Sequence, residues 1–213
     1  MTGTEDLSYR KITETIVGKL DLLEAYLFYC LALCSDCYTM VQMLSRNIDR
    51  VLWNKKEEQI RQWLHKFEDL NLIQIDKHPI KGKYGSFDRC RYILNTEHYV
   101  FISKKLYSEP ISRQLKGFLV LLKCKCLNAT NTCQYTQSEL AKELNISPSS
   151  VSRYLKQAED GGYIKRDDKG IHLKDRKMFI ITSETTFAFI KNVYPNILTD
   201  EDIAERKIHN YNE

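Results

Sequence analysis

The chain has 213 residues, of which 43% are hydrophobic and 28% charged, and its formal net charge is +4. This length suffices for two modest cores, and the small charge excludes a protein that is basic throughout, so any nucleic-acid surface requires clustered cations. The longest apolar run, residues 22–34, contains Glu24 and is too short to span a membrane. We therefore expect a soluble, cytoplasmic protein that has no membrane partner.

The first part of the chain predicts a strand, an apolar helix and a pair of shorter helices. The segment SYRKIT (8–13) reads as a strand and leads into an apolar helix over 22–33. Helical spacing returns at 38–48 and again from Glu57, after a long turn in which Asn54 is the expected cap. Three apolar residues of the later helix are expected to face inward: Ile60, Leu64 and Phe67.

Residues 77–91 predict a basic β-hairpin, the first wing. Its lysines, histidine and arginines stand against a lone acid, Asp88. Such hairpins enter minor grooves or follow a phosphate backbone, although an ordinary solvated hairpin has the same composition. Because Glu57 and Glu58 would repel phosphates, the helix that they begin is also a candidate surface for a protein partner. Candidate DNA-binding residues of this region are Lys55, Lys56, Gln59, Gln62, Lys81, Lys83 and Arg89.

A strand-like segment follows each wing. HYVFIS (98–103) comes after the first wing, and MFIIT (178–182) comes after a second hairpin at 163–173. With turns at 95–97 and 174–176, each segment is expected to be the third strand of its wing, which makes each wing a small meander.

The clearest pattern of the chain lies between the apolar segment 115–122 and the second hairpin. Thr136 is expected to cap a helix and to form a capping box with Glu139. Ser147 is expected to cap the next helix, with Pro148 in its first turn. The inward residues of that helix are Val151, Tyr154, Leu155 and Ala158.

The outward side of the same helix carries short hydroxyls, an amide and cations. Side chains of these types donate hydrogen bonds to phosphates and to base edges. The second hairpin adds three cations. We therefore expect the following residues to contact DNA: Ser147, Ser149, Ser150, Ser152, Arg153, Lys156, Gln157, Lys165, Arg166 and Lys169.

The segment LAKELNISPSSVSRYLKQAEDGGYI (140–164) resembles the winged helix-turn-helix domains of bacterial transcription regulators of the MarR and related types. The resemblance covers about forty residues. It implies DNA binding, although helix-turn-helix units also serve as protein-protein modules.

The pattern occurs twice, because 38–48 and 57–76 match the helix pair of the second half, and SYRKIT matches HYVFIS. Duplicated winged helices of this kind look like the theta-type plasmid and phage replication initiators. We expect an α+β, mainly helical chain made of two tandem winged helix-turn-helix domains with small antiparallel wings. The first domain covers 7–103, the second covers 104–182, and a helical tail covers 183–213.

Three functions remain open for such a chain. A transcription regulator that binds double-stranded DNA is favoured, and a non-nicking replication initiator is the alternative. An assembly protein with one DNA-binding and one protein-binding domain is a further alternative. A second copy of the chain and a protein of the replication or transcription machinery stay open as partners.

We expect no enzyme activity and no cofactor. The chain lacks a Walker lysine loop, a dinucleotide glycine fingerprint and an HExxH motif. Seven cysteines are present, and those at 30 and 34 fall on the apolar phase of a helix, which is typical of core residues. Metal binding or redox sensing is the less favoured interpretation, with Cys34, Cys37 and Cys133 as candidates.

Overall fold

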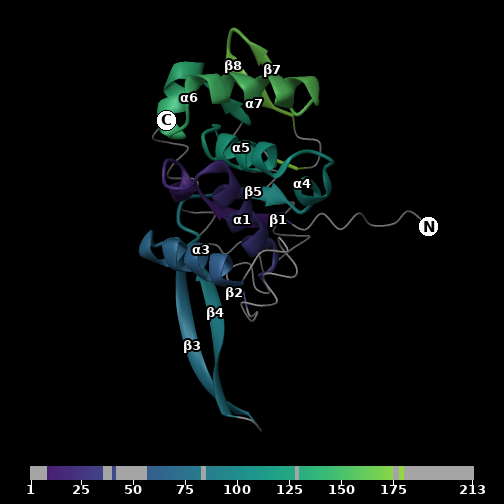
Figure 1. Ribbon diagram of the computed structural model, residues 1–213. Coiled ribbons are helices and arrows are strands. Elements are labelled where there is room, and N and C mark those ends of the chain that lie inside the picture. The colour runs from purple at the N-terminus through teal and green to yellow at the C-terminus, as the bar shows by residue number, and fades with distance from the viewer. Residues whose placement is uncertain are drawn as a thin grey trace, which may run out of the picture.

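A computed structural model describes residues 9–35, 40–41, 57–82, 85–127, 130–174 and 178–179 (Figure 1). Several sequence predictions fall outside these ranges. They are most of the helix predicted over 38–48, the turn with Asn54, the tail 183–213, and the candidate residues Lys55, Lys56, Lys83 and Cys37. Of the segment 38–48 the structure describes Met40 and Val41, which form a strand and not a helix because they pair with Ile93 and Tyr92.

The described part of the first half forms short antiparallel strands and the helices η1, α1 and α3. The 12-residue helix α1 begins after Asp21, whose carboxylate accepts from the Glu24 N–H while Glu24 accepts from the Asp21 N–H. The predicted bounds of this helix are confirmed. The elements are β1 (Tyr9–Thr13), η1 (Glu14–Ile16), α1 (Leu22–Leu33), β2 (Met40–Val41), α3 (Glu57–Asp69), β3 (Ile73–Gly82) and β4 (Gly85–Leu94).

The second half has a similar order of described elements, with the additional helix α6. Ser112 caps the apolar helix α5 as Asp21 caps α1, by accepting from the N–H three residues later. The elements are β5 (Tyr99–Ser103), α4 (Lys105–Ser108), α5 (Arg113–Cys124), β6 (Thr132–Cys133), α6 (Gln137–Glu143), α7 (Pro148–Asp160), β7 (Ile164–Asp167) and β8 (Gly170–Leu173).

Each half contains a three-stranded antiparallel wing sheet, and the strand orders correspond. The first sheet has the order β2-β4-β3 and the second has the order β6-β8-β7. In the first sheet β2 pairs only with Tyr92 and Ile93, whereas β3 and β4 pair along their whole length. The third strand of each wing therefore comes from earlier in the chain, before α3 in the first sheet and before α6 in the second.

The prediction that 98–103 and 178–182 are the third strands of the wings is wrong. β5 pairs antiparallel with β1, with Tyr9 opposite Ser103, and Phe179 bridges Ile102 from the other side. All five residues of β5 are buried, which suits a strand that is covered on both faces rather than an exposed wing. The three similar sequence segments thus lie beside one another.

The turns from α3 into β3 and from α7 into β7 have the same geometry. Asn71 and Gly162 occupy matching places with left-handed backbones, at φ 56° and 71°. In each turn the next residue donates its N–H to the carbonyl five residues earlier, at 2.8 Å. The carbonyl of that same residue, Leu72 or Tyr163, accepts a hydrogen bond at 2.9 Å from the N–H of the residue that follows the last wing strand. The two turns are alike although their sequences differ.

The core is continuous across both halves, and α1 packs on α5 within it. Gly117 lies at this contact, where an added Cβ would stand 1.7 Å from the carbonyl oxygen of Leu22. The helix backbones therefore approach as closely as a glycine permits. None of the helices in the described ranges is long and apolar enough to span a bilayer.

Replacing Gly117 tests this contact. Because the new methyl group would collide with backbone, Gly117→Ala should lower the free energy of unfolding by at least about 3 kcal/mol. Gly162→Ala is the matched control, since a Cβ there meets nothing within 4 Å and carries only the left-handed backbone cost of about 1 to 2 kcal/mol. Urea unfolding of both variants gives the comparison, and equal losses would contradict the close contact.

Candidate nucleic-acid interface

Local hydrogen bonds fix where α6 and α7 begin. The Thr136 hydroxyl accepts from the Glu139 N–H, and the Glu139 carboxylate accepts from the Thr136 N–H, so the predicted capping box is confirmed. Ser147 caps α7 by accepting from the Ser150 N–H at 3.2 Å, and Pro148 occupies the first position. The sequence therefore determines the start of both helices.

The inner side of α7 packs on the core as predicted. Val151, Leu155 and Ala158 are fully buried, and Tyr154 is 5% exposed. The Tyr154 ring stacks on Phe118 of α5 with centroids 5.5 Å apart. This contact fixes the rotation of α7 about its axis and so decides which residues face outward.

The outer side of α7 presents the expected polar residues to solvent. Arg153 is the best positioned of them, because its guanidinium lies 4.8 Å from the Tyr154 ring centroid and its Nη2 donates to the Tyr154 hydroxyl at 3.2 Å. An arginine held in this way loses little side-chain freedom when it binds an anion. The exposed members of this surface are Ser147, Ser149, Ser152, Arg153, Lys156 and Gln157, with Ser150 half-buried beside them.

Three serine hydroxyls gather at the first turn of α7. Ser147 Oγ lies 3.0 Å from Ser149 Oγ and donates to Ser150 Oγ at 2.9 Å. No acidic side chain lies in this turn. Small donors at a helix N-terminus suit the approach of a phosphate oxygen.

The second wing carries the predicted cations, but one of them is occupied. Arg166 donates from both Nε and Nη2 to the Glu159 carboxylate at the end of α7, with the Nε bond at 3.0 Å. The hydrogen bonds from Arg166 lower the pKa of Glu159. Lys165 and Lys169 are exposed, and Lys165 lies 3.8 Å from Asp167. Arg166 therefore holds the wing on α7 in this structure.

A cross-strand set of polar side chains joins the three strands of this wing. His172 contacts Thr132 of β6 at 3.0 Å through Nδ1 and Asp167 of β7 at 2.7 Å through Nε2. The hydrogen bond from His172 lowers the pKa of Asp167. These contacts fix the wing sheet beside α7.

In the first half the predicted inward residues of α3 are confirmed, since Ile60, Leu64 and Phe67 are buried. Gln59 and Gln62 are exposed, as is the acidic Glu58. Lys66 donates to both carboxylate oxygens of the buried Glu24, at 2.6 and 2.7 Å, and so ties α3 to α1. The cationic candidates of this half, Lys81 and Arg89, stand opposite Ser86 and His78 in the β3–β4 register.

The cysteine candidates have separate surroundings. Burial raises the pKa of Cys30 to about 12 and also raises the pKa values of Cys34 and Cys133, so these thiols are protonated at neutral pH. Cys34 follows α1, whereas Cys133 lies on β6. Within the described residues no group of three potential metal ligands occurs.

Two residues of the site were missed by sequence reasoning. Tyr154 was assigned to the core alone, but it also orients Arg153. The sequence signal for this second role was that Tyr154 directly follows Arg153 in the chain. Glu159 was not assigned, yet it binds Arg166 seven residues further on. The spacing alone does not predict that bond, because it depends on how the wing folds back on α7.

Comparison with known families agrees with this geometry. Residues 130–165 match the winged helix-turn-helix DNA-binding family, and the match covers β6, α6, α7 and the beginning of β7. The chain therefore contains a winged helix-turn-helix DNA-binding domain at these residues. No curated protein matches the chain.

Removing the Glu159 carboxylate tests whether the bond to Glu159 keeps Arg166 from contacting DNA. Glu159→Gln should strengthen DNA binding and raise the salt dependence by about one phosphate contact, because Arg166 becomes available. Fluorescence anisotropy over a range of KCl concentrations measures both. Asp160→Asn is the control, since it removes the same charge while the Glu159–Arg166 bond stays. An equal change in both variants would rule out release of Arg166.

Proposed function

We propose that the chain is a double-stranded DNA-binding protein of two tandem winged-helix domains that acts as a transcription regulator and has no catalytic activity. The observation that carries the proposal is the outer side of α7. There Arg153 and Lys156 stand exposed above a serine-rich, acid-free N-terminus, inside the segment that matches a DNA-binding family.

Three observations support the duplication. The two wing sheets have corresponding strand orders, the helices α1 and α5 are capped in the same way, and the turns after α3 and α7 share their hydrogen bonds. We place the first domain at 7–103 and the second at 104–182. Such agreement between distant segments is difficult to obtain except by repetition of one unit.

A non-nicking replication initiator is the second candidate, and the junction between the halves favours it. Helix α1 of the first domain packs on α5 of the second, so the halves share one core. A single copy with two fixed winged helices can contact two stretches of one duplex without dimerising. A regulator of the MarR type instead reaches two half-sites through a symmetric dimer.

Selection of genomic DNA fragments by the purified chain distinguishes these candidates. Direct repeats near a replication gene support the initiator, whereas a single palindrome before a promoter supports the dimeric regulator. Size measurement of the protein–DNA complex gives an independent answer, because the palindrome requires two copies. If the unmodified chain enriches no DNA fragment more strongly than the Arg153→Ala variant does, the proposal of DNA binding is contradicted.

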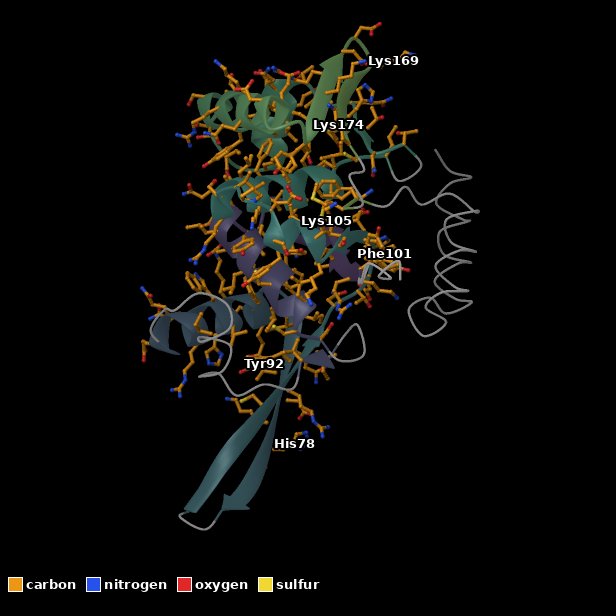
Figure 2. All side chains as sticks on the ribbon, turned by 90° about the vertical axis from the view of Figure 1, so that its right-hand side faces the viewer. His78, Tyr92, Phe101, Lys105, Lys169 and Lys174 are labelled. Carbon is orange, nitrogen blue, oxygen red and sulfur yellow. The ribbon has the colours of Figure 1, made fainter. Side chains whose placement is uncertain are left out.

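The α7 surface is tested by removing its two cations. Arg153→Ala combined with Lys156→Ala should weaken DNA binding at least about tenfold, which is the cost of two charge-assisted contacts. Lys104→Ala with Lys105→Ala is the matched control, since both lysines are exposed and stand at the start of α4 rather than on α7. Figure 2 shows Lys105 apart from Lys169 at the tip of the second wing. Electrophoretic mobility shift measures the affinities. An equal loss in both pairs would place the interface elsewhere.

A further inference from the structure

A cavity of about 270 Å³ lies between the second wing and the loop that leads into α6. The wing contributes residues 166–171, the loop contributes residues 134–137, and Leu155 of α7 lines the cavity as well. Sites for drug-sized ligands have volumes of about 300 to 1,000 Å³, so an occupant of this cavity is a smaller molecule.

Contacts between the wing and the preceding loop hold the cavity in shape. Gly170 lies so close to β6 that an added Cβ would stand 2.5 Å from the Cys133 carbonyl oxygen. Cys133 also pairs with Ile171 in the sheet, and the Thr136 capping box fixes the first turn of α6. The cavity is therefore formed before any ligand arrives.

One part of the cavity lining is apolar. Leu155 is fully buried and Ile171 is 5% exposed, so both belong to the core. Tyr135 is half-buried and lines the same cavity. An apolar group of a ligand would lose contact with water here, which favours its binding.

Two charged side chains stand at the rim. Asp168 and Lys169 are the two turn residues of the hairpin, and both are exposed (Figure 2). Within the described part of the chain, their charged groups make no hydrogen bond or ion pair. The neighbouring Asp167 is occupied, because its carboxylate accepts from His172 Nε2 at 2.7 Å and from the Lys169 N–H at 2.9 Å.

The rim thus offers one carboxylate and one ammonium group beside an apolar lining. An inorganic anion would leave Asp168 without a counter-charge and the apolar lining exposed to water. An uncharged apolar molecule would bring two charges to its edge without meeting either of them. A small zwitterion with an apolar group satisfies all three features.

We infer that this cavity binds a free α-amino acid with an apolar side chain and that the bound amino acid weakens DNA binding. Its carboxylate meets Lys169, and its ammonium group meets Asp168. Its side chain lies against Leu155 and Ile171. The amides of Gln134 and Gln137, which also line the cavity, supply further hydrogen bonds.

The effect on DNA rests on the proposed DNA-binding function. Lys169 is a wing cation that we expect to contact a phosphate, and a bound carboxylate occupies the same ammonium group. Arg166 also lines the cavity, and a carboxylate there holds this second cation on the wing as well. DNA and the amino acid therefore compete, and each lowers the affinity for the other by the same factor.

Thermal unfolding of the full chain with each proteinogenic L-amino acid tests the site. An amino acid that binds the folded chain raises the thermal midpoint. Asp168→Asn and Lys169→Ala should each weaken its binding about tenfold or more, the cost of one charge-assisted contact. Asp160→Asn and Lys142→Ala are the matched controls, because they remove the same charges from exposed side chains that do not line the cavity.

Two derivatives of the most strongly bound amino acid test the zwitterion. Its amide lacks the carboxylate, and its N-acetyl derivative lacks the ammonium group, so neither should raise the thermal midpoint. A derivative that binds as tightly as the amino acid overturns the charge pairing. The site is also overturned if no amino acid raises the midpoint, or if the cavity variants and their controls respond equally.

Fluorescence anisotropy on the most strongly bound genomic fragment tests the effect on DNA. Saturation with the amino acid should weaken DNA binding by the unmodified chain about fivefold or more, whereas Lys169→Ala should not respond. An amino acid that binds without changing the DNA affinity overturns this effect. A chain that binds an amino acid but no DNA contradicts the proposed function, and one that binds DNA but no amino acid contradicts the cavity inference alone.

Discussion

The close packing of α1 on α5 is the constraint on which the arrangement of the molecule depends. Gly117 lets the two backbones meet, and the core continues from this contact into both halves. Polar contacts secure it: the Tyr29 hydroxyl donates to the Ser103 carbonyl at 2.7 Å and accepts from the Tyr107 N–H at 3.1 Å. Lys116, only 6% exposed, donates to the Tyr107 carbonyl. The two halves are therefore joined through one continuous core.

The sequence predicted what is decided locally. The Thr136 capping box, the Ser147 cap and the inward face of α7 depend on residues within one or two turns, and all were found as predicted. The partner of β5 was mispredicted, because β1 lies some ninety residues earlier and an alternating pattern does not specify a partner. In the site, the outward residues of α7 follow from helical periodicity, whereas the Glu159–Arg166 bond requires the folded wing.

The two halves share a plan but differ in where their polar groups lie. In the second half the exposed cations stand on a helix whose first turn is free of acids. In the first half the helix α3 exposes Glu58, and its Lys66 is bound to Glu24 of α1. Most of the clustered basic residues of this half lie on the elongated hairpin of β3 and β4. The sheet order and the turns thus agree between the halves, whereas their surfaces differ, because few core contacts constrain a surface residue.

Helix α5 contacts both α1 and α7 through adjacent residues. Gly117 meets the backbone of Leu22, and the next residue, Phe118, stacks on Tyr154, which in turn orients Arg153. A displacement of α1 along α5 would therefore reach the guanidinium through two aromatic rings. A ligand that favoured such a displacement would change the affinity of α7 for its own ligand, and thermodynamic reciprocity would require the reverse effect to be equally large. The contacts of α5 are thus the route by which the two ends of the molecule would be coupled.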